Sequence, residues 1–250
     1  MTLYKNMATR INQAQHIIVL TGAGVSTASG IPDFRSSGGI WEQDRSREYY
    51  MSSEYFQKEP EDFWRKYKAI FQMKLVGTYH PNNVHLFLQQ LEAKGKKISI
   101  ITQNVDGLHE RAGNTTIINY HGTLQSATCP TCGTSYGLSY IMNSETPYCN
   151  DLYGSTPCGD ILKPDIVLFG DSITEHDKAE AIIDQGDLLL VMGTSLFVMP
   201  FNFLPDYAIY QRSLPSILIN REETMKDNIF DVVVHDDLSK AIHHIQRFLQ

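Results

Sequence analysis

Residues 16–35 read His16-Ile17-Ile18-Val19-Leu20-Thr21-Gly22-Ala23-Gly24-Val25-Ser26-Thr27-Ala28-Ser29-Gly30-Ile31-Pro32-Asp33-Phe34-Arg35, and this stretch decides the fold. Its apolar start predicts a buried parallel strand. Glycines at 22 and 24 remove the Cβ obstruction, and the N–H groups at the start of a following helix face negative charge. The spacing differs from G-x-G-x-x-G, because Gly30 comes six residues after Gly24. The turn alone is therefore equally consistent with a structural turn and with a nucleotide site.

Similar apolar runs recur along the chain and are separated by segments with helical spacing. The runs that predict strands are 16–21, 98–102, 187–192, 216–220 and 232–234. The segments that predict helices are 3–13, 62–71, 81–95 (beginning at Pro81), 176–185, 202–212 and 238–249. This alternation predicts an α/β fold with a doubly wound, Rossmann-like parallel sheet.

Composition limits the class of protein. The chain has 250 residues, of which 42% are hydrophobic and 20% charged, as in globular proteins. A net charge of −7 argues against a nucleic-acid partner. No apolar run approaches the ~18 residues that a membrane span requires, and the N-terminus carries no apolar signal stretch. We expect a cytoplasmic, monomeric protein that binds neither nucleic acid nor membrane.

The segment 123–163 breaks the alternation and holds all four cysteines. Cys129 and Cys132 are separated by two residues and followed by a glycine, which is typical of a zinc knuckle. Cys149 follows after sixteen residues and Cys158 after eight more, a wider second spacing than usual. Without a secretion signal, disulfides are disfavoured. Four thiolates leave no open position on the metal, so we expect a structural zinc rather than a catalytic one.

Polar side chains follow several of the predicted strands. Gln103, Asn104 and Asp106 come directly after the strand at 98–102, and His121 precedes the cysteine segment. Ligands in open parallel sheets bind at the carboxyl ends of the strands. Histidine has a suitable pKa for a general base near neutrality. From spacing alone, an Asx-type turn explains Gln103, Asn104 and Asp106 as well as a binding site does. For His121 alone, a structural role is the favoured interpretation.

Taken together, these stretches resemble the sirtuins, the NAD-dependent protein lysine deacylases. The motifs that carry the resemblance are Gly22–Ser26 with Gly30–Arg35, Thr102–His109 with Ala112-Gly113, His121-Gly122, the paired cysteines, Lys163–Gly170, Gly193–Ser195 and Asn220. They cover nearly the whole chain in family order. The short ends of the chain are similar to those of small bacterial members.

The resemblance implies NAD as co-substrate, lying across the strand ends. It implies three catalytic residues, with Asn104 and Asp106 in a nicotinamide pocket and His121 as general base on a ribose hydroxyl. The acyl oxygen attacks the ribose carbon as nicotinamide leaves, and the acyl group then moves to the sugar. The implied cofactor-binding residues are Gly22, Ala23, Gly24, Ser26, Thr27, Asp33, Phe34, Arg35, Gln103, Asn104, Val105, Asp106, His121, Gly193, Thr194, Ser195, Asn220, Arg221 and Asp236.

The resemblance also implies how the protein substrate binds. An acyl-lysine peptide enters an apolar tunnel and pairs as an extended strand with the enzyme. The implied substrate residues are Phe34, Val167, Phe169, Gly170 and Val198. Family members that remove succinyl or malonyl groups carry Tyr-x-x-Arg, whereas Tyr67 is here followed three residues later by Ile70. A bidentate carboxylate anchor is therefore missing, which favours neutral acyl groups, with acetyl first.

We expect three parts within one sirtuin-type catalytic domain, 1–250. A Rossmann-like large domain comprises 1–34, 76–122 and 164–250; a cofactor loop and helical module comprises 35–75; and a zinc-binding module comprises 123–163. The main alternative function is a protein mono-ADP-ribosyltransferase, which shares NAD cleavage. A non-catalytic NAD-binding module predicts losses at Asn104, Asp106 or His121, and none is lost. An ordinary NAD oxidoreductase predicts a regular Rossmann glycine spacing.

Overall fold

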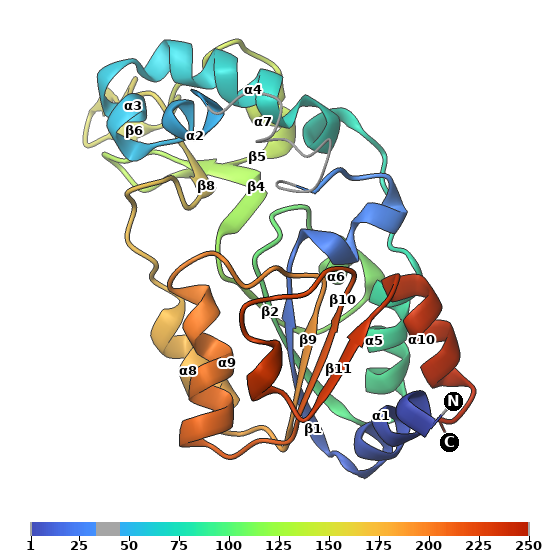
Figure 1. Ribbon diagram of the computed structural model, residues 1–250. Coiled ribbons are helices and arrows are strands. Elements are labelled where there is room, and N and C mark those ends of the chain that lie inside the picture. The colour runs from blue at the N-terminus through green and yellow to red at the C-terminus, as the bar shows by residue number, and fades with distance from the viewer. Residues whose placement is uncertain (1, 34–45, 250) are drawn as a thin grey trace.

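The computed structural model describes residues 2–33 and 46–249 (Figure 1). Its main sheet has six strands in the order β11-β10-β9-β1-β2-β3. The bounds are β1 His16–Thr21, β2 Lys97–Thr102, β3 Thr116–Asn119, β9 Leu188–Met192, β10 Ser216–Asn220 and β11 Val232–His235. All neighbouring strands pair in parallel. The strand order reverses between β1 and β9, so a crevice for ligands is expected outside their carboxyl ends.

Helices cover both faces of this sheet, as the doubly wound prediction requires (Figure 1). One face carries α1 Thr2–Gln13, α5 Asn83–Ala93 and α10 Leu238–Gln246; the other carries α8 His176–Ile183 and α9 Leu204–Asp206. A short helix, α6 Leu108–Ala112, follows β2. Each face has its own buried core, with Phe87 and Leu88 in one and Phe201 and Leu218 in the other. The fold class is confirmed.

Three details differ from the sequence predictions. The edge strand β3 was not predicted, because its four residues are all half-buried and form no continuous apolar run. The helix expected from Pro81 begins at Asn83, since the Asn82 side chain accepts a hydrogen bond from the Val84 amide at 2.9 Å. The helix expected over 202–212 is divided into the turn Phe201–Phe203, the short α9 and a π-helical turn, Tyr207–Gln211.

A smaller unit sits above the carboxyl edge of the sheet (Figure 1). Its helices are α2 Ser46–Tyr50, α3 Ser53–Lys58, α4 Pro60–Val76 and α7 Leu138–Met142; its strands are β4 Gly122–Thr128, β5 Ser135–Gly137, β6 Leu152–Tyr153, β7 Thr156–Pro157 and β8 Lys163–Ile166. A separate core includes Phe63, Trp64 and Tyr67 from α4. The Trp64 indole donates to the Leu162 carbonyl at 2.7 Å, which ties α4 to the residue before β8.

The turn after β1 packs against the end of β9 too closely for side chains. A Cβ at Gly24 would lie 2.8 Å from the Gly193 Cα, and one at Gly22 would lie 2.7 Å from the Thr194 Cβ. The Gly24 amide donates to the Gly193 carbonyl at 2.9 Å. The glycines therefore have a packing role that the structure shows directly, since neighbouring backbone atoms cannot move aside cheaply.

We expect Gly24→Ala to lower the free energy of unfolding by about 1–3 kcal/mol, because the added methyl overpacks against backbone. Gly137→Ala is the control, since its φ is −78° and an added Cβ meets nothing within 4 Å. Urea unfolding of both variants measures the difference. Equal midpoints for the two would contradict the close-packing account of this turn.

Candidate active site

A cavity of about 650 Å³ lies between the carboxyl edge of the main sheet and the smaller unit. It collects most of the site residues predicted from sequence. These are Gly22, Ala23, Gly24, Thr27, Asp33, Gln103, Asn104, Val105, His121, Val167, Phe169, Gly170, Gly193, Thr194, Ser195, Val198, Asn220, Arg221 and Asp236. They come from the ends of β1, β2, β3, β8, β9, β10 and β11 and from the loops that follow these strands. The topology thus places residues that are distant in sequence around one space.

Two predicted residues, Ser26 and Asp106, are not among the described residues that line the cavity. The Ser26 hydroxyl donates to Asp106 Oδ2 at 2.8 Å, and the Leu108 amide donates to Oδ1 at 3.0 Å. The buried Asn104 amide donates to Ser26 Oγ at 3.2 Å and to the Gly22 carbonyl at 3.1 Å. Asp106 therefore fixes Ser26, and Ser26 in turn holds the Asn104 side chain at the cavity wall. Two further predicted residues, Phe34 and Arg35, lie outside the described residues.

His121 occupies the junction between the two units. It follows β3 and precedes β4, and its carbonyl accepts a hydrogen bond from the Val167 amide at 2.9 Å. Its ring lies against the rings of Tyr120 and Phe201, with centroid distances of 5.5 and 6.5 Å. The half-buried imidazole thus borders the cavity between the polar strand ends and the smaller unit.

The polar strand ends are linked across the floor of the cavity. The Gln103 side-chain amide donates to Thr194 Oγ1 at 2.8 Å, joining the loop after β2 to the loop after β9. At the far end, Arg221 pairs with Asp237 at 3.0 Å. Glycines at 22 and 24 allow the backbone to approach a phosphate closely, and hydroxyl and amide side chains surround this turn. Such groups bind phosphate and ribose oxygens, so the site fits a dinucleotide.

Apolar lining residues that sequence reasoning missed come mainly from the smaller unit. Met51, Phe71, Ile166 and Leu168 line the cavity on that side. At the mouth, Phe197 and Met199 are 63% and 68% exposed, unusual for such side chains. Ile166 and Leu168 lie within the motif Lys163–Gly170 but were not named as site residues, and no motif marks Met51, Phe71, Phe197 or Met199. Only the packing of α2 and α4 over the strand ends reveals them.

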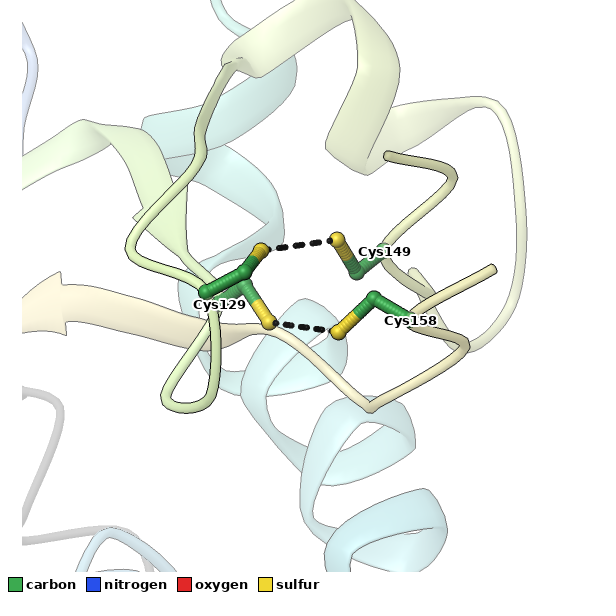
Figure 2. Close-up of side chains that lie close together, drawn as sticks. Cys129, Cys149 and Cys158 are labelled. Atoms are coloured by element: carbon green, nitrogen blue, oxygen red, sulfur yellow. Dashed lines mark hydrogen bonds between the residues drawn. The ribbon is translucent and has the colours of Figure 1, made fainter. Parts of the chain in front are cut away.

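The four cysteines converge in the smaller unit, and Figure 2 labels three of them, Cys129, Cys149 and Cys158. Their sulfur atoms all lie within 4.8 Å of one another, with Cys129–Cys158 at 3.5 Å and Cys132–Cys149 at 3.4 Å. Tetrahedral zinc with Zn–S bonds of about 2.3 Å places sulfurs about 3.8 Å apart, so the cluster fits a structural Zn²⁺. The long second spacing is absorbed by the exposed hairpin β6–β7 between Cys149 and Cys158.

Two buried histidines lie behind the loop that carries Asn104. The His85 and His109 rings are 4.8 Å apart, and His109 accepts from or donates to Thr21 Oγ1 at 3.1 Å. Burial lowers the pKa of His109 to about 3, with His85 adding to the effect. Burial also lowers the pKa of His85 to about 4, against an opposing effect of Asp106. Both imidazoles are therefore neutral in the folded chain at neutral pH.

We expect acid to destabilise the fold through this pair. In the unfolded chain both histidines become protonated below the ordinary histidine pKa of about 6.5. In the folded chain His85 becomes protonated only near pH 4 and His109 only near pH 3. Stability is thus fully present above pH 6.5 and falls on acidification, by about 1.4 kcal/mol per pH unit for each histidine. Urea midpoints at pH 7.5 and 5.0 measure the loss. His109→Asn should flatten the dependence, whereas the exposed His243→Asn should not.

A parallel α/β sheet, a crevice with a glycine turn and a histidine, and a four-thiol unit together define a sirtuin-type protein. The chain belongs to the Sir2 family, whose sequence model matches residues 22–200. It is 47% identical over 231 residues to an NAD-dependent protein deacetylase of Bacillus subtilis, covering 92% of this chain and 94% of that protein. It is 45% identical to NAD-dependent protein deacetylase 2 of Geobacillus kaustophilus, covering 98% of each.

Solved structures agree with this assignment. A Sir2 structure with a deacetylated p53 peptide and 3'-O-acetyl ADP ribose has a TM-score of 0.85 and 30% identity, covering 97% of both chains. A Sir2 structure with a p53 peptide and NAD⁺ has a TM-score of 0.79 and 31% identity, covering 97% of this chain and 95% of that one. The resemblance stated from the sequence motifs is thus confirmed.

Proposed function

We propose that this protein is an NAD-dependent protein lysine deacetylase that transfers the acyl group to ADP-ribose and releases nicotinamide. One observation carries the proposal: a single cavity places His121 between glycine-turn and strand-end residues on one side and apolar side chains on the other. NAD supplies the ribose that accepts the acyl group. The relatives named as NAD-dependent protein deacetylases support the same reaction.

Each end of the cavity has a distinct role in this proposal. Ala23 and Gly24 bind the pyrophosphate, and Thr194, Ser195, Asn220 and Asp236 bind the adenosine half. Gln103 and Asn104 face the ribose and nicotinamide, and Asp106 holds Asn104 and Ser26 in place through the hydrogen bonds described above. His121 takes a proton from a ribose hydroxyl, for which a half-buried imidazole at the cavity wall is suited.

The acyl group is proposed to be neutral. The cavity wall toward the smaller unit is apolar, with Met51, Phe71 and Leu168. Among the described lining residues the one lysine or arginine is Arg221, which is paired with Asp237 at the opposite end. Tyr67 is 1% exposed in the aromatic core. Such a wall binds an acetyl group by apolar contact and leaves a succinyl carboxylate unpaired.

We further propose that the protein substrate binds as an extended strand between the segments that hold Gly170 and Val198. Phe169 and Phe197 flank this entrance with exposed aromatic surface. The proposed working form is a cytoplasmic monomer that binds no nucleic acid, in keeping with the net charge of −7. No helix among the described residues is long and apolar enough to cross a bilayer.

The three expected parts also enter the proposal as a division of roles. The large unit holds NAD along its strand ends, helices α2 to α4 of the 35–75 module cover the acyl group, and the 123–163 module supports the substrate strand. In this proposal His121 lies where the three parts meet. In this arrangement the zinc takes no part in the chemistry, because four thiolates fill its coordination sphere.

Mass spectrometry of acetyl-, butyryl-, myristoyl- and succinyl-lysine peptides, with and without NAD, tests the function. We expect NAD-dependent loss of acetyl with formation of nicotinamide and O-acetyl-ADP-ribose, and no detectable loss of succinyl. Preference for a longer neutral chain would keep the reaction and change the substrate. NAD consumption without deacylation, or a protein that gains the mass of ADP-ribose, would instead establish the mono-ADP-ribosyltransferase alternative.

A further inference from the structure

A hydrogen-bonded chain outside the cavity reaches the residue next to His121. The fully buried Tyr120 hydroxyl lies 2.6 Å from His176 Nδ1, and His176 Nε2 lies 3.4 Å from Glu180 Oε1. His176 and Glu180 are one turn apart on α8, whereas Tyr120 follows the edge strand β3. None of these three residues is among the described residues that line the cavity.

The direction of these hydrogen bonds follows from the chemistry of the groups. Burial, and to a lesser extent the nearby Glu180 carboxylate, raises the pKa of Tyr120, so its hydroxyl stays protonated. In the tautomer that carries its proton on Nε2, His176 accepts a hydrogen bond from this hydroxyl at Nδ1, and Nε2–H faces Glu180 Oε1 at 3.4 Å.

Tyr120 is held by hydrogen bonds at its backbone amide and at its hydroxyl. Its backbone amide donates to the Thr102 carbonyl at 2.9 Å, and its hydroxyl is held by α8. Between these points its ring packs edge-on against the rings of Phe201, at 5.1 Å, and His121, at 5.5 Å. Because His121 is the next residue along the chain, a change in the Tyr120 rotamer displaces both the backbone and one packing surface of the His121 imidazole.

We propose that Tyr120 is a positioning residue for His121, and that His176 with Glu180 holds Tyr120 in the rotamer that places the His121 imidazole at the cavity wall. This inference rests on the proposed function and adds residues that the sequence motifs do not mark. It assigns to α8 an influence on the acyl-transfer step without any contact with either substrate.

The test compares two reactions of the full-length protein. Deacetylation needs the His121 base, whereas exchange of labelled nicotinamide into NAD reports only the earlier cleavage at the ribose. We expect Tyr120→Phe and His176→Ala each to lower the kcat of deacetylation by about 10- to 100-fold, with unchanged KM for NAD and near wild-type exchange, because a misplaced base affects only the later step. The double variant should lose no more than either single variant.

Two further variants separate positioning from general stability. His176→Asn offers an acceptor near the Nδ1 position and should restore most of the deacetylation. Tyr207→Phe removes another tyrosine hydroxyl, which donates to Asp184 just after α8 at 2.8 Å, and should change neither reaction. Equal loss of exchange and deacetylation in Tyr120→Phe, or wild-type kcat in it, would overturn the positioning role. Absence of both reactions in the wild type would refute the proposed function itself.

Discussion

His121→Ala is expected to lower NAD-dependent deacetylation by roughly 10³-fold, within the range of about 10²–10⁴ for loss of a general base. The imidazole borders the cavity beside Asn104 and Gln103, and the described lining residues include no other histidine. The acidic side chains among these lining residues are Asp33, Asp171, Glu222, Asp236 and Asp237. A carboxylate is ordinarily a much weaker base than imidazole. Steady-state assays with an acetyl-lysine peptide measure the loss.

NAD binding should survive this substitution, because the glycine turn and the strand ends after β9 and β10 are unchanged. Calorimetric titration with NAD and a nicotinamide-exchange assay check this point, and a thermal melt confirms that the variant is folded. The control is His243→Ala, an exposed histidine on α10 away from the cavity. A wild-type kcat in the His121→Ala variant would show that His121 is not the general base of the reaction.

Loss of the metal is expected to have the second large effect, on stability as well as activity. Zinc binding by thiolates contributes about 10–16 kcal/mol in small zinc domains at neutral pH. Cys129 and Cys149 are 1% and 3% exposed and share a core with Phe63 and Trp64 of α4. Unfolding around the thiols therefore also releases the helix that covers the cavity. Even about 4 kcal/mol lost lowers the Tm by roughly 8–16 °C in a chain of this size.

Cys129→Ala is the variant for this test, with Ser135→Ala on the exposed face of β5 as the control. Elemental analysis should find one zinc per chain in the wild type and in Ser135→Ala, and much less in Cys129→Ala. Removal of zinc by a chelator should shift the tryptophan emission to longer wavelength and abolish deacetylation, and added zinc should reverse both effects. One zinc per chain at wild-type Tm in Cys129→Ala would contradict a four-thiolate site.

The sequence predicts well those parts of the site that are formed by residues close together in the chain. A glycine turn directly after a buried strand, polar residues at strand ends and a Cys-x-x-Cys turn are local patterns, so the residues concerned can be named before any contact is known. Ala23, Asn104, Thr194 and Asn220 line the cavity as expected. The strands that carry them were likewise predicted, because each is a continuous buried apolar run.

The contacts that the sequence could not predict join distant segments. The Lys68 ammonium donates to the Ile141 carbonyl at 2.6 Å and joins α4 to α7. The Asp106 carboxylate accepts hydrogen bonds from the Ser26 hydroxyl and the Leu108 amide, and its expected role at nicotinamide stays a prediction. In both cases a polar side chain satisfies a partner whose position only the packing of another element provides.

The sequence by itself determined five of the six strands of the sheet, the family, the glycine turn and the four thiols, because each depends on residues close together in the chain or on apolar runs that must be buried. Only the tertiary structure decided which side chains share the cavity, since Met51 and Phe71 reach it through the packing of the smaller unit over the strand ends. It alone also joined Tyr120 to His176, 56 residues apart, because a buried hydroxyl must find a partner wherever the fold supplies one.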